Sequence, residues 1–285
     1  MKDFYFTIFT PCYNAANTIC RVFKSIEGQT YKNFEWIIIN DGSTDNSDEV
    51  INNLINTSSI DRRKIIYLTQ KNKGKHIAWN RAVDLAKGEL FLSADADDSF
   101  LPNTLAFYNA KFNILIGEQA LTDCKFSGIN VCVYNPIDKK MIGTPYPYDG
   151  LISDNIELQY KYKISGEHWG IIRTDLLKKN KFPEMKGHFW TEGRIWFSFA
   201  IQDYKVCCFN ECLRAYYYEP NSLVHDKKSY FNRDRVYMFL LNNIWVIKKC
   251  GLRILKYSPT GYFQLWNDVI KNIIKLCLIK IQKHN

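Results

Sequence analysis

The stretch FYFTIFTPCYNAANTICRVFKSIEGQTYKNFEWIIINDGSTDNS, residues 4–47, alternates apolar runs with a helical pattern. Residues 4–9 and 34–39 are apolar, partly aromatic runs of the length of a buried strand. Between them, Val22, Phe23 and Ile26 fall on one face of a helix, for which Asn17 is a suitable N-cap. The stretch therefore predicts a β-α-β unit with two parallel strands.

The next fifty residues continue this alternation. Apolar residues at helical spacing within 50–55 predict a second helix, and residues 65–68 predict a third short strand. A third helix is expected from about residue 76 to residue 86, with Gly88 as its C-terminal stop, before a fourth strand that begins at residues 90–92. This order predicts an α/β fold with a Rossmann-like, mostly parallel sheet and helices on both of its faces.

Polar segments follow all four predicted strands, at the edge where parallel sheets bind their ligands. They are Pro11–Asn14, Asn40–Ser43, Asn72–Lys75 and Asp95–Asp98. The second is suited to accept hydrogen bonds from a nucleobase, or to form a turn before the next helix. The lysines of the third suit phosphate or simply a solvated loop. Neither a P-loop nor the G-x-G-x-x-G of nicotinamide and flavin enzymes is found here.

The fourth segment is densely acidic, since Asp95, Asp97 and Asp98 lie within four positions. Carboxylates this close repel one another, and solvent, basic neighbours or a bound cation relieves the repulsion. Mg²⁺ and Mn²⁺ suit one or two carboxylates, with phosphate oxygens and water as further ligands. The segment therefore predicts a metal–diphosphate site, and the alternative is a solvated acidic turn before the next helix.

Two runs together resemble the family-2 glycosyltransferases of the GT-A fold. They are TPCYNAANTICRVFKSIEGQTYKNFEWIIINDGSTDNS (10–47) and NKGKHIAWNRAVDLAKGELFLSADADDSFLPN (72–103). The resemblance is strong over residues 5–105 and weaker to about residue 225. It implies an inverting transfer, in which an acceptor hydroxyl attacks the anomeric carbon of a nucleotide sugar. It also implies a UDP-sugar donor and Mn²⁺ or Mg²⁺ as cofactor.

The resemblance also implies roles for individual residues of the first hundred. The nucleotide-binding residues would be Pro11 and Tyr13 at the nucleoside, Asp41 at the base, and Lys75 and Asn80 beside the nucleoside and phosphates. Asp95 and Asp97 would form the D-x-D element. Asp97 would bind the metal, Asp95 would contact the ribose or support the metal, and Asp98 would be a further support.

For the acceptor side, the family's catalytic base is an acid in a Glu-Asp or Asp-Asp pair before an aromatic-rich helix. The matching segment makes Glu192 the candidate base, although Gly193 replaces the second acid. The alternative is a carboxylate at a helix N-terminus, with Thr191 as the cap. Glu167, Trp169 and Trp190 are expected at the acceptor, with core packing an equal alternative for the tryptophans. His188 and His225 are further candidates for metal or phosphate contacts.

The positive charge of the chain is concentrated at its C-terminal end. The formal net charge is +9, and residues 227–285 hold 12 Lys and Arg against 2 Asp and Glu. We expect residues 1–226 to form the GT-A domain, with a nucleotide-sugar half at 1–105 and an acceptor-side half at 106–226. Residues 227–285 would form a basic helical extension that either packs on the domain or rests on an anionic membrane surface.

No stretch approaches about 18 uninterrupted apolar residues, so we expect no transmembrane helix. The nine cysteines include no C-x-x-C pair, and the N-terminus does not resemble a signal peptide. These features predict a cytoplasmic protein with reduced thiols. The family resemblance implies a surface glycan or a lipid-linked glycan as the acceptor. Two other functions remain open, a nucleotidyltransferase and a catalytically silent nucleotide- or carbohydrate-binding homologue. The first would need a glycine-rich basic loop that residues 11–17 lack. No nucleic-acid motif accompanies the basic tail.

Overall fold

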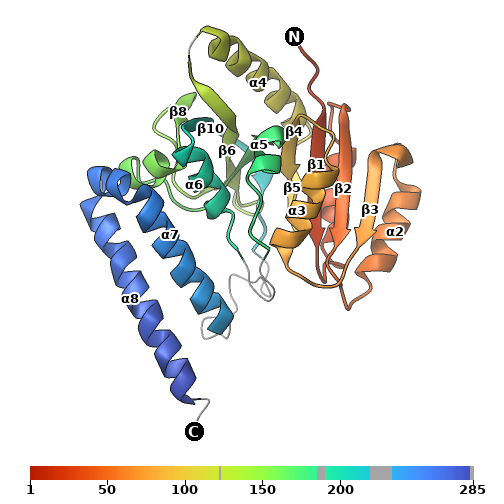
Figure 1. The fold of residues 1–285 in the computed structure, drawn as a ribbon. Coiled ribbons are helices and arrows are strands. Elements are labelled where there is room, and N and C mark those ends of the chain that lie inside the picture. Colours follow the sequence, from red (N-terminus) through yellow and green to blue (C-terminus); the bar gives the residue numbers. More distant parts are fainter. Residues whose placement is uncertain (122, 185–189, 219–232, 283–285) are drawn as a thin grey trace.

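The computed structural model describes residues 1–121, 123–184, 190–218 and 233–282, with side chains as far as Ile279. Its first third alternates strands and helices: β1 (Phe6–Cys12), α1 (Ile19–Glu27), β2 (Phe34–Asn40), α2 (Ser47–Thr57), a 3₁₀ turn η1 (Arg62–Lys64), β3 (Ile65–Thr69), α3 (Lys75–Leu85) and β4 (Leu90–Ser93). The four strands are parallel and lie in the order β3-β2-β1-β4 (Figure 1). This arrangement confirms the predicted α/β fold.

The following residues widen the same sheet. They form β5 (Ser99–Phe100), α4 (Thr104–Leu121), β6 (Lys125–Tyr134), β7 (Met141–Ile142), β8 (Leu151–Ser153), a π-helical turn η2 (Glu157–Lys161), β9 (His168–Arg173), α5 (Thr174–Lys179), α6 (Gly193–Ile201) and β10 (Tyr204–Ala215). Beyond β4 the strand order is β9-β6-β10-β5, and β9 is antiparallel to both of its neighbours. The two expected halves, 1–105 and 106–226, thus share one ten-stranded sheet. The boundary at residue 226 lies outside the described residues and stays a prediction.

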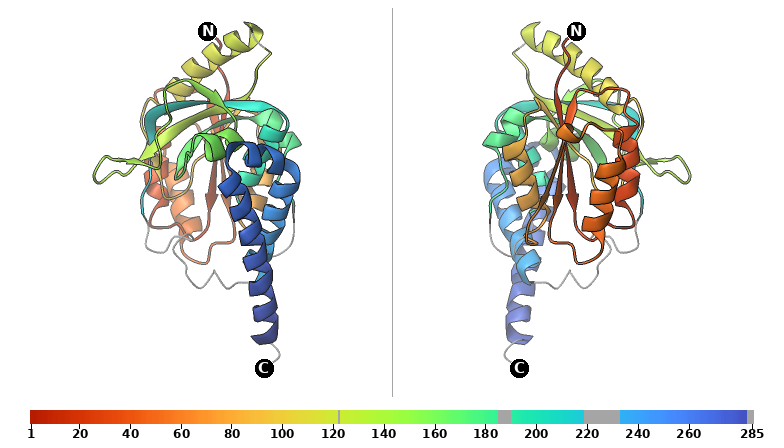
Figure 2. Two further views of the ribbon diagram at one scale, coloured as in Figure 1. Left: turned by 90° about the vertical axis from the view of Figure 1, so that its left-hand side faces the viewer. Right: turned by 90° about the vertical axis from the view of Figure 1, so that its right-hand side faces the viewer.

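Apolar residues alternate along the strands and cover both faces of the sheet. On one face, Phe6, Trp36 and Leu92 pack against α1, α2 and α4. On the other, Phe9 and Phe91 pack against α3, α5 and α6. Figure 2 shows these two helical layers on either side of the strands. The two layers hold the carboxyl ends of β1–β4 at one edge, where the polar segments emerge.

Two local expectations about helix ends need correction. α1 begins at Ile19 after Thr18, not after Asn17. α3 ends at Leu85 with Ala86 as its C-cap, so Gly88 does not stop the helix. Gly88 instead lies against β1, where a Cβ atom would come within 2.3 Å of the Thr7 nitrogen. Close packing of the chain before β4 against β1 therefore requires glycine at this position.

The C-terminal residues form a helical hairpin, α7 (Arg233–Tyr257) and α8 (Pro259–Gln282). Ser258 begins the second helix, because its hydroxyl accepts a hydrogen bond from the Gly261 amide at 3.1 Å. α7 packs on α6 and η2 through a small core that contains Phe197, Val246 and Ile254. In the described part of the chain, no helix has both the length and the apolar character needed to cross a membrane.

Candidate active site

Asp41, at the end of β2, organises the loop between β3 and α3. Its side chain is buried, and its carboxylate accepts hydrogen bonds from the Gln70 amide and from the backbone amides of Lys73 and Gly74, at 2.7–3.0 Å. Gly42 makes the close approach possible, since a Cβ there would lie 2.7 Å from the Asn72 nitrogen. Asp41 therefore holds the loop, and a carboxylate has further lone pairs to offer a base.

Lys75, the first residue of α3, connects two predicted site residues. Its Nζ atom lies 2.9 Å from Asp95 Oδ1 and 2.9 Å from Glu192 Oε1. Burial acts to lower the pKa of Lys75, but the two carboxylates outweigh it and raise the pKa above its ordinary value. The candidate base and the acidic segment, 97 positions apart in the sequence, therefore share one ammonium group.

Arg214, near the end of β10, was not predicted from the sequence. Its buried guanidinium donates from Nε to Asp98 Oδ2 at 2.6 Å and from Nη2 to Asp95 Oδ2 at 3.0 Å. The ring centroids of Trp169 and Tyr216 lie 5.9 and 5.7 Å from it, within the range of cation–π attraction. The sequence signal for Arg214 is its position at the end of a strand, which is also where the polar segments after β1–β4 lie.

The three acids of the Asp95–Asp98 segment do not converge on one point. Asp98 is buried and accepts a hydrogen bond from Arg214. Its carboxylate therefore holds Arg214 in place, and the geometry does not support the expected role as a metal support. Burial raises the pKa of Asp98, and the Arg214 guanidinium opposes that rise. Among the described residues, no group of three His, Cys, Asp or Glu side chains is placed to hold a metal.

Asp97 is the acid that this arrangement leaves for a ligand. It is half-buried, and it forms no ion pair with any residue that the structure describes. Burial and the neighbouring charge of Asp95 raise its pKa, whereas Lys75 and Arg214 hold the pKa of Asp95 at about 2 against the effect of burial. Arg21 lies beside this position and donates to the Asp97 carbonyl oxygen at 2.6 Å. A half-buried carboxylate with a second acid nearby fits a hard divalent ion that takes its other ligands from phosphate and water.

Glu192 occupies the N-cap position of α6 and faces the site. Its φ and ψ are −59° and −24°, so Glu192 does lie at a helix N-terminus, as the alternative interpretation had it, but no side chain caps this helix end and Thr191 is not the cap. The side chain is 41% exposed and reaches Lys75. Glu167 precedes β9 and is exposed as a whole residue, but its carboxylate end is partly shielded from solvent. This shielding and the charges of Asp95 and Glu192 raise its pKa, and the Arg214 guanidinium opposes the rise. Both glutamates therefore border the same acidic edge.

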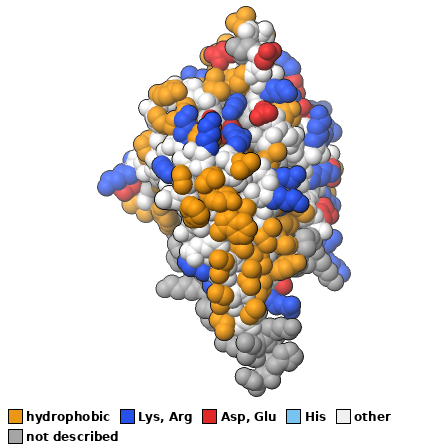
Figure 3. Space-filling model, turned by 60° about the vertical axis from the view of Figure 1, so that its left-hand side comes forward, with side chains coloured by type: hydrophobic (Ala, Val, Ile, Leu, Met, Phe, Trp, Pro, Cys, Tyr) orange, Lys and Arg blue, Asp and Glu red, His pale blue; other side chains and the backbone are white. Residues whose placement is uncertain are grey.

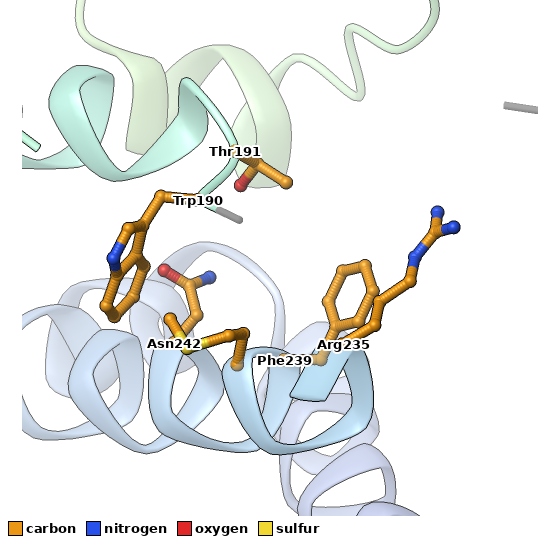
Figure 4. A pocket seen from close by; sticks show the side chains of 6 residues that line it. Trp190, Thr191, Arg235, Phe239 and Asn242 are labelled. Atoms are coloured by element: carbon orange, nitrogen blue, oxygen red, sulfur yellow. The ribbon is translucent and has the colours of Figure 1, made fainter. Parts of the chain in front are cut away.

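The two tryptophans expected at the acceptor are buried instead. Trp169 is 5% exposed, stacks on Phe100 with ring centroids 4.7 Å apart, and donates from Nε1 to the Ser93 carbonyl at 2.6 Å. It belongs to the core and is not available to a sugar. Trp190 is also 5% exposed, and the Arg194 guanidinium lies 4.5 Å from its ring. It lines a small pocket between α6 and α7 (Figure 4), together with Thr191, Arg235, Met238, Phe239 and Asn242.

The remaining predicted residues fall into different surroundings. Pro11 is half-buried in β1, and Tyr13 is 49% exposed just beyond it. Asn80 is buried in α3, where its amide exchanges hydrogen bonds with the Phe182 backbone and also reaches Glu184. A donor contact by Asn80 is therefore not supported, because its side chain holds residues 182–184 against α3. His188 and His225 lie outside the described residues.

Comparisons with known proteins show similarity to glycosyltransferases. Residues 7–106 match the family model described as glycosyl transferase family 2. The glycosyltransferase GlyA of Streptococcus pneumoniae is 38% identical over 98 residues, which is 34% of this chain and 14% of that protein. A glycosyltransferase of Rickettsia conorii, RC0461, is 31% identical over 185 residues, 65% of this chain and 28% of that protein. The chain thus spans well under half the length of these relatives.

Solved structures show the same fold at low sequence identity. Staphylococcus aureus TarS 1-349, in complex with UDP-GlcNAc, superposes with a TM-score of 0.62 at 17% identity, over 94% of this chain and 72% of that one. The mannosyltransferase PcManGT of Pyrobaculum calidifontis, in complex with GDP-Man and Mn²⁺, superposes with a TM-score of 0.55 at 18% identity, over 97% and 73%. Residues 7–106 therefore resemble glycosyl transferase family 2, and the chain has a fold similar to that of the GT-A glycosyltransferases.

Proposed function

We propose that this chain is an inverting glycosyltransferase that moves a sugar from a nucleotide donor to a hydroxyl group of a glycan or lipid-linked acceptor. The observation that carries the proposal is the position of Lys75, which contacts Asp95 of the donor side and Glu192 of the acceptor side at 2.9 Å each. A donor bound over the Asp95–Asp98 segment would lie within reach of both Lys75 and Glu192. In this proposal, Lys75 is the cation for the leaving diphosphate and Glu192 is the carboxylate for the incoming hydroxyl.

In the proposed reaction, Glu192 accepts the proton of the acceptor hydroxyl as its oxygen bonds to the anomeric carbon. The bond from that carbon to the diphosphate breaks, and its electron pair leaves with the nucleoside diphosphate. Lys75 meets the charge that grows on the diphosphate. A divalent ion held by Asp97, with Asp95 beside it, would neutralise part of the same charge.

The contacts of Lys75 also suggest how donor binding prepares Glu192. In the structure the ammonium group is shared between Asp95 and Glu192, so the Glu192 carboxylate is held in an ion pair. A diphosphate carries more negative charge than a carboxylate and would draw Lys75 toward itself. Glu192 would then be released to act on the acceptor after the donor has bound.

The comparisons support the class of substrate. TarS is described in complex with UDP and with UDP-GlcNAc, and PcManGT with GDP-Man and Mn²⁺. The hyaluronan synthase of Pasteurella multocida is 38% identical over 99 residues, 35% of this chain and 10% of that protein. We therefore favour a UDP-sugar, Mn²⁺ or Mg²⁺, and a role in surface polysaccharide synthesis. None of the nine cysteines, all of which lie in the described residues, forms a disulfide, which supports a reducing compartment such as the cytoplasm.

A catalytically silent binding homologue is the second candidate. Gly193 stands where the family pattern has a second acid, and the remaining acid, Glu192, is paired with Lys75. Such a protein would bind the nucleotide sugar and transfer nothing. It would keep the donor-side residues and lack a working base.

Calorimetric titration with UDP, GDP and CDP, with and without Mn²⁺, tests the donor site. We expect UDP to bind in a metal-dependent manner, and Asp97→Ala to abolish the metal dependence. Asp138→Ala, which alters an exposed turn between β6 and β7, is the matched control and should bind like the wild type. Binding of no nucleotide under any metal condition would refute the proposed donor site. Binding without hydrolysis or transfer of any UDP-sugar would favour the silent homologue.

A further inference from the structure

One face of α8 is apolar and has no partner among the described residues. Phe263, Trp266, Ile270, Ile273, Ile274 and Leu278 recur every three or four positions, and we call them the α8 stripe. Their side chains are 43–66% exposed. Another face of α8, which includes Leu265 and the buried Val269, turns toward the molecule. Because a helix repeats every 3.6 residues, the stripe lies on a side that packing against α7 does not cover.

α7 also exposes apolar side chains. Phe239, Ile244 and Leu252 of that helix are 41%, 44% and 86% exposed. Figure 3 shows hydrophobic side chains gathered over the hairpin, whereas the surface above it carries many Lys, Arg, Asp and Glu side chains. Soluble monomers rarely expose apolar patches of this extent, and such patches mark interaction surfaces.

The charges of the hairpin indicate what covers the patch. Asp268 is the one acidic residue in the sequence of α8, while Lys271 and Lys275 lie one helical turn apart along the edge of the stripe. Across residues 233–282 the sequence has nine basic residues and two acidic ones: Arg233, Arg235, Lys248, Lys249, Arg253, Lys256, Lys271, Lys275 and Lys280, against Asp234 and Asp268. A second copy of the chain docked on this face would bring like charges together, whereas an anionic surface would be attracted.

We propose that the α8 stripe rests on an anionic lipid bilayer, with the helix lying in the plane of the headgroups. An apolar stripe bordered by lysines is the pattern of helices that lie at a membrane surface. No described helix can cross the bilayer, so the hairpin contacts the lipid from one side. This surface does not involve the donor-side residues, and the proposal does not depend on the chain being an active transferase.

The placement of the hairpin relates the bilayer to the candidate active site. α8 runs in the direction of the arrows of β1–β3 and, to one side of the sheet, extends past the level at which these strands end (Figure 1). The pocket between α6 and α7 lies between these regions, since it includes Thr191, next to Glu192, and the exposed Phe239 of α7. A membrane-bound acceptor would thus approach Glu192 along an apolar path.

Vesicle flotation with the full chain tests the proposal. We expect the wild type to float with vesicles of phosphatidylcholine and phosphatidylglycerol, to bind pure phosphatidylcholine about tenfold less, and to dissociate as salt rises. The pair Ile270→Glu with Ile274→Glu should lose binding by about tenfold or more, and Lys271→Glu with Lys275→Glu should lose the preference for anionic lipid. Ile137→Glu is the matched control, because Ile137 is 90% exposed on the turn between β6 and β7.

Circular dichroism spectra that match the wild type would show that each variant keeps its fold. Equal flotation of the wild type and of the Ile270/Ile274 variant would overturn the proposal, as would the absence of flotation with anionic vesicles. Light scattering after size exclusion addresses the second copy as occupant. A dimer that the same variant converts to monomers would assign the stripe to self-association and not to lipid.

Discussion

The two sides of the candidate site are built in opposite ways. On the donor side, Asp41, Lys75 and Asp95 each follow a strand of the parallel sheet and lie within 55 residues of one another. On the other side, Glu192 and Arg214 come from distant elements: Glu192, at the start of α6, pairs with Lys75, and Arg214 of β10 pairs with Asp95. The comparison teaches that the donor side is local in the sequence, whereas the chemistry proposed for the acceptor side depends on long-range packing.

The largest effect is expected where the acceptor side would act chemically. Glu192→Gln removes the proposed base, and turnover should fall by roughly 10²- to 10⁴-fold, the usual contribution of general base catalysis. Nucleotide binding should survive, because the donor-side residues are unchanged. Steady-state assays of transfer, or of donor hydrolysis, would measure the loss. Glu211→Gln, at an exposed position of β10, serves as the control. Full turnover in Glu192→Gln would assign the base to another residue.

The next effect concerns the buried link between the two sides. Arg214→Met leaves the carboxylates of Asp95 and Asp98 without their shared guanidinium, and the free energy of unfolding should fall by about 3–5 kcal/mol. Urea unfolding measures the change. Arg173→Met is the control, since Arg173 pairs at 2.8 Å with Asp175, which is half exposed, and should cost about 1 kcal/mol or less. Equal costs for the two variants would contradict the role given to Arg214.

A smaller effect is expected at Asp154, which anchors the hairpin. Its buried carboxylate accepts hydrogen bonds from Lys205 and from Arg253 of α7, each at 2.6 Å. Burial acts to raise the pKa of Asp154, but these two cations lower it below the ordinary value. Asp154→Asn should therefore cost about 1.5–3 kcal/mol of unfolding free energy at neutral pH.

The sign of the pH dependence follows from that depressed pKa. The stabilisation by Asp154 is fully present above the unfolded-state pKa of about 3.9, and it is lost as the pH falls through the lower pKa of the folded state. Urea unfolding of the wild type and Asp154→Asn at pH 7 and pH 3 should show the difference between them shrinking in acid. A difference that stays constant would show that Asp154 acts through packing alone.

The smallest effect sharpens the proposed exchange of Lys75 between the two sides. If Glu192 competes with the diphosphate for Lys75, Glu192→Gln should bind UDP roughly twofold to fivefold more tightly, the strength of a partly exposed ion pair. Uridine, which has no diphosphate, should bind both proteins equally. Lys75→Gln should weaken UDP binding and remove the effect of the Glu192 change. Unaltered UDP affinity in Glu192→Gln would refute the exchange while leaving the donor site intact.

The outcomes for individual residues follow the same division. The β-α-β order was predictable because alternating apolar runs and helical spacing are properties of neighbouring residues. The burial of Trp169 and Asn80 was not predictable, because each packs against a residue that is distant in the sequence. Phe100 stacks on Trp169, and the Phe182 carbonyl accepts a hydrogen bond from the Asn80 amide. The role of Arg214 was not predictable for the same reason, since its carboxylate partners lie 116 and 119 positions earlier in the sequence.

By itself, the sequence determined the parallel sheet, the edge at which its polar segments gather, and the amphipathic pattern of the C-terminal helices. Periodicity and strand-end chemistry are local, so a single chain displays them. Only the tertiary structure decided that Arg214 and Lys75 share Asp95, that Asp97 is left for a ligand, and that the α8 stripe faces outward. Those facts depend on which charges and apolar faces find partners. The folded arrangement alone settles this, because pairing is decided by distance in space.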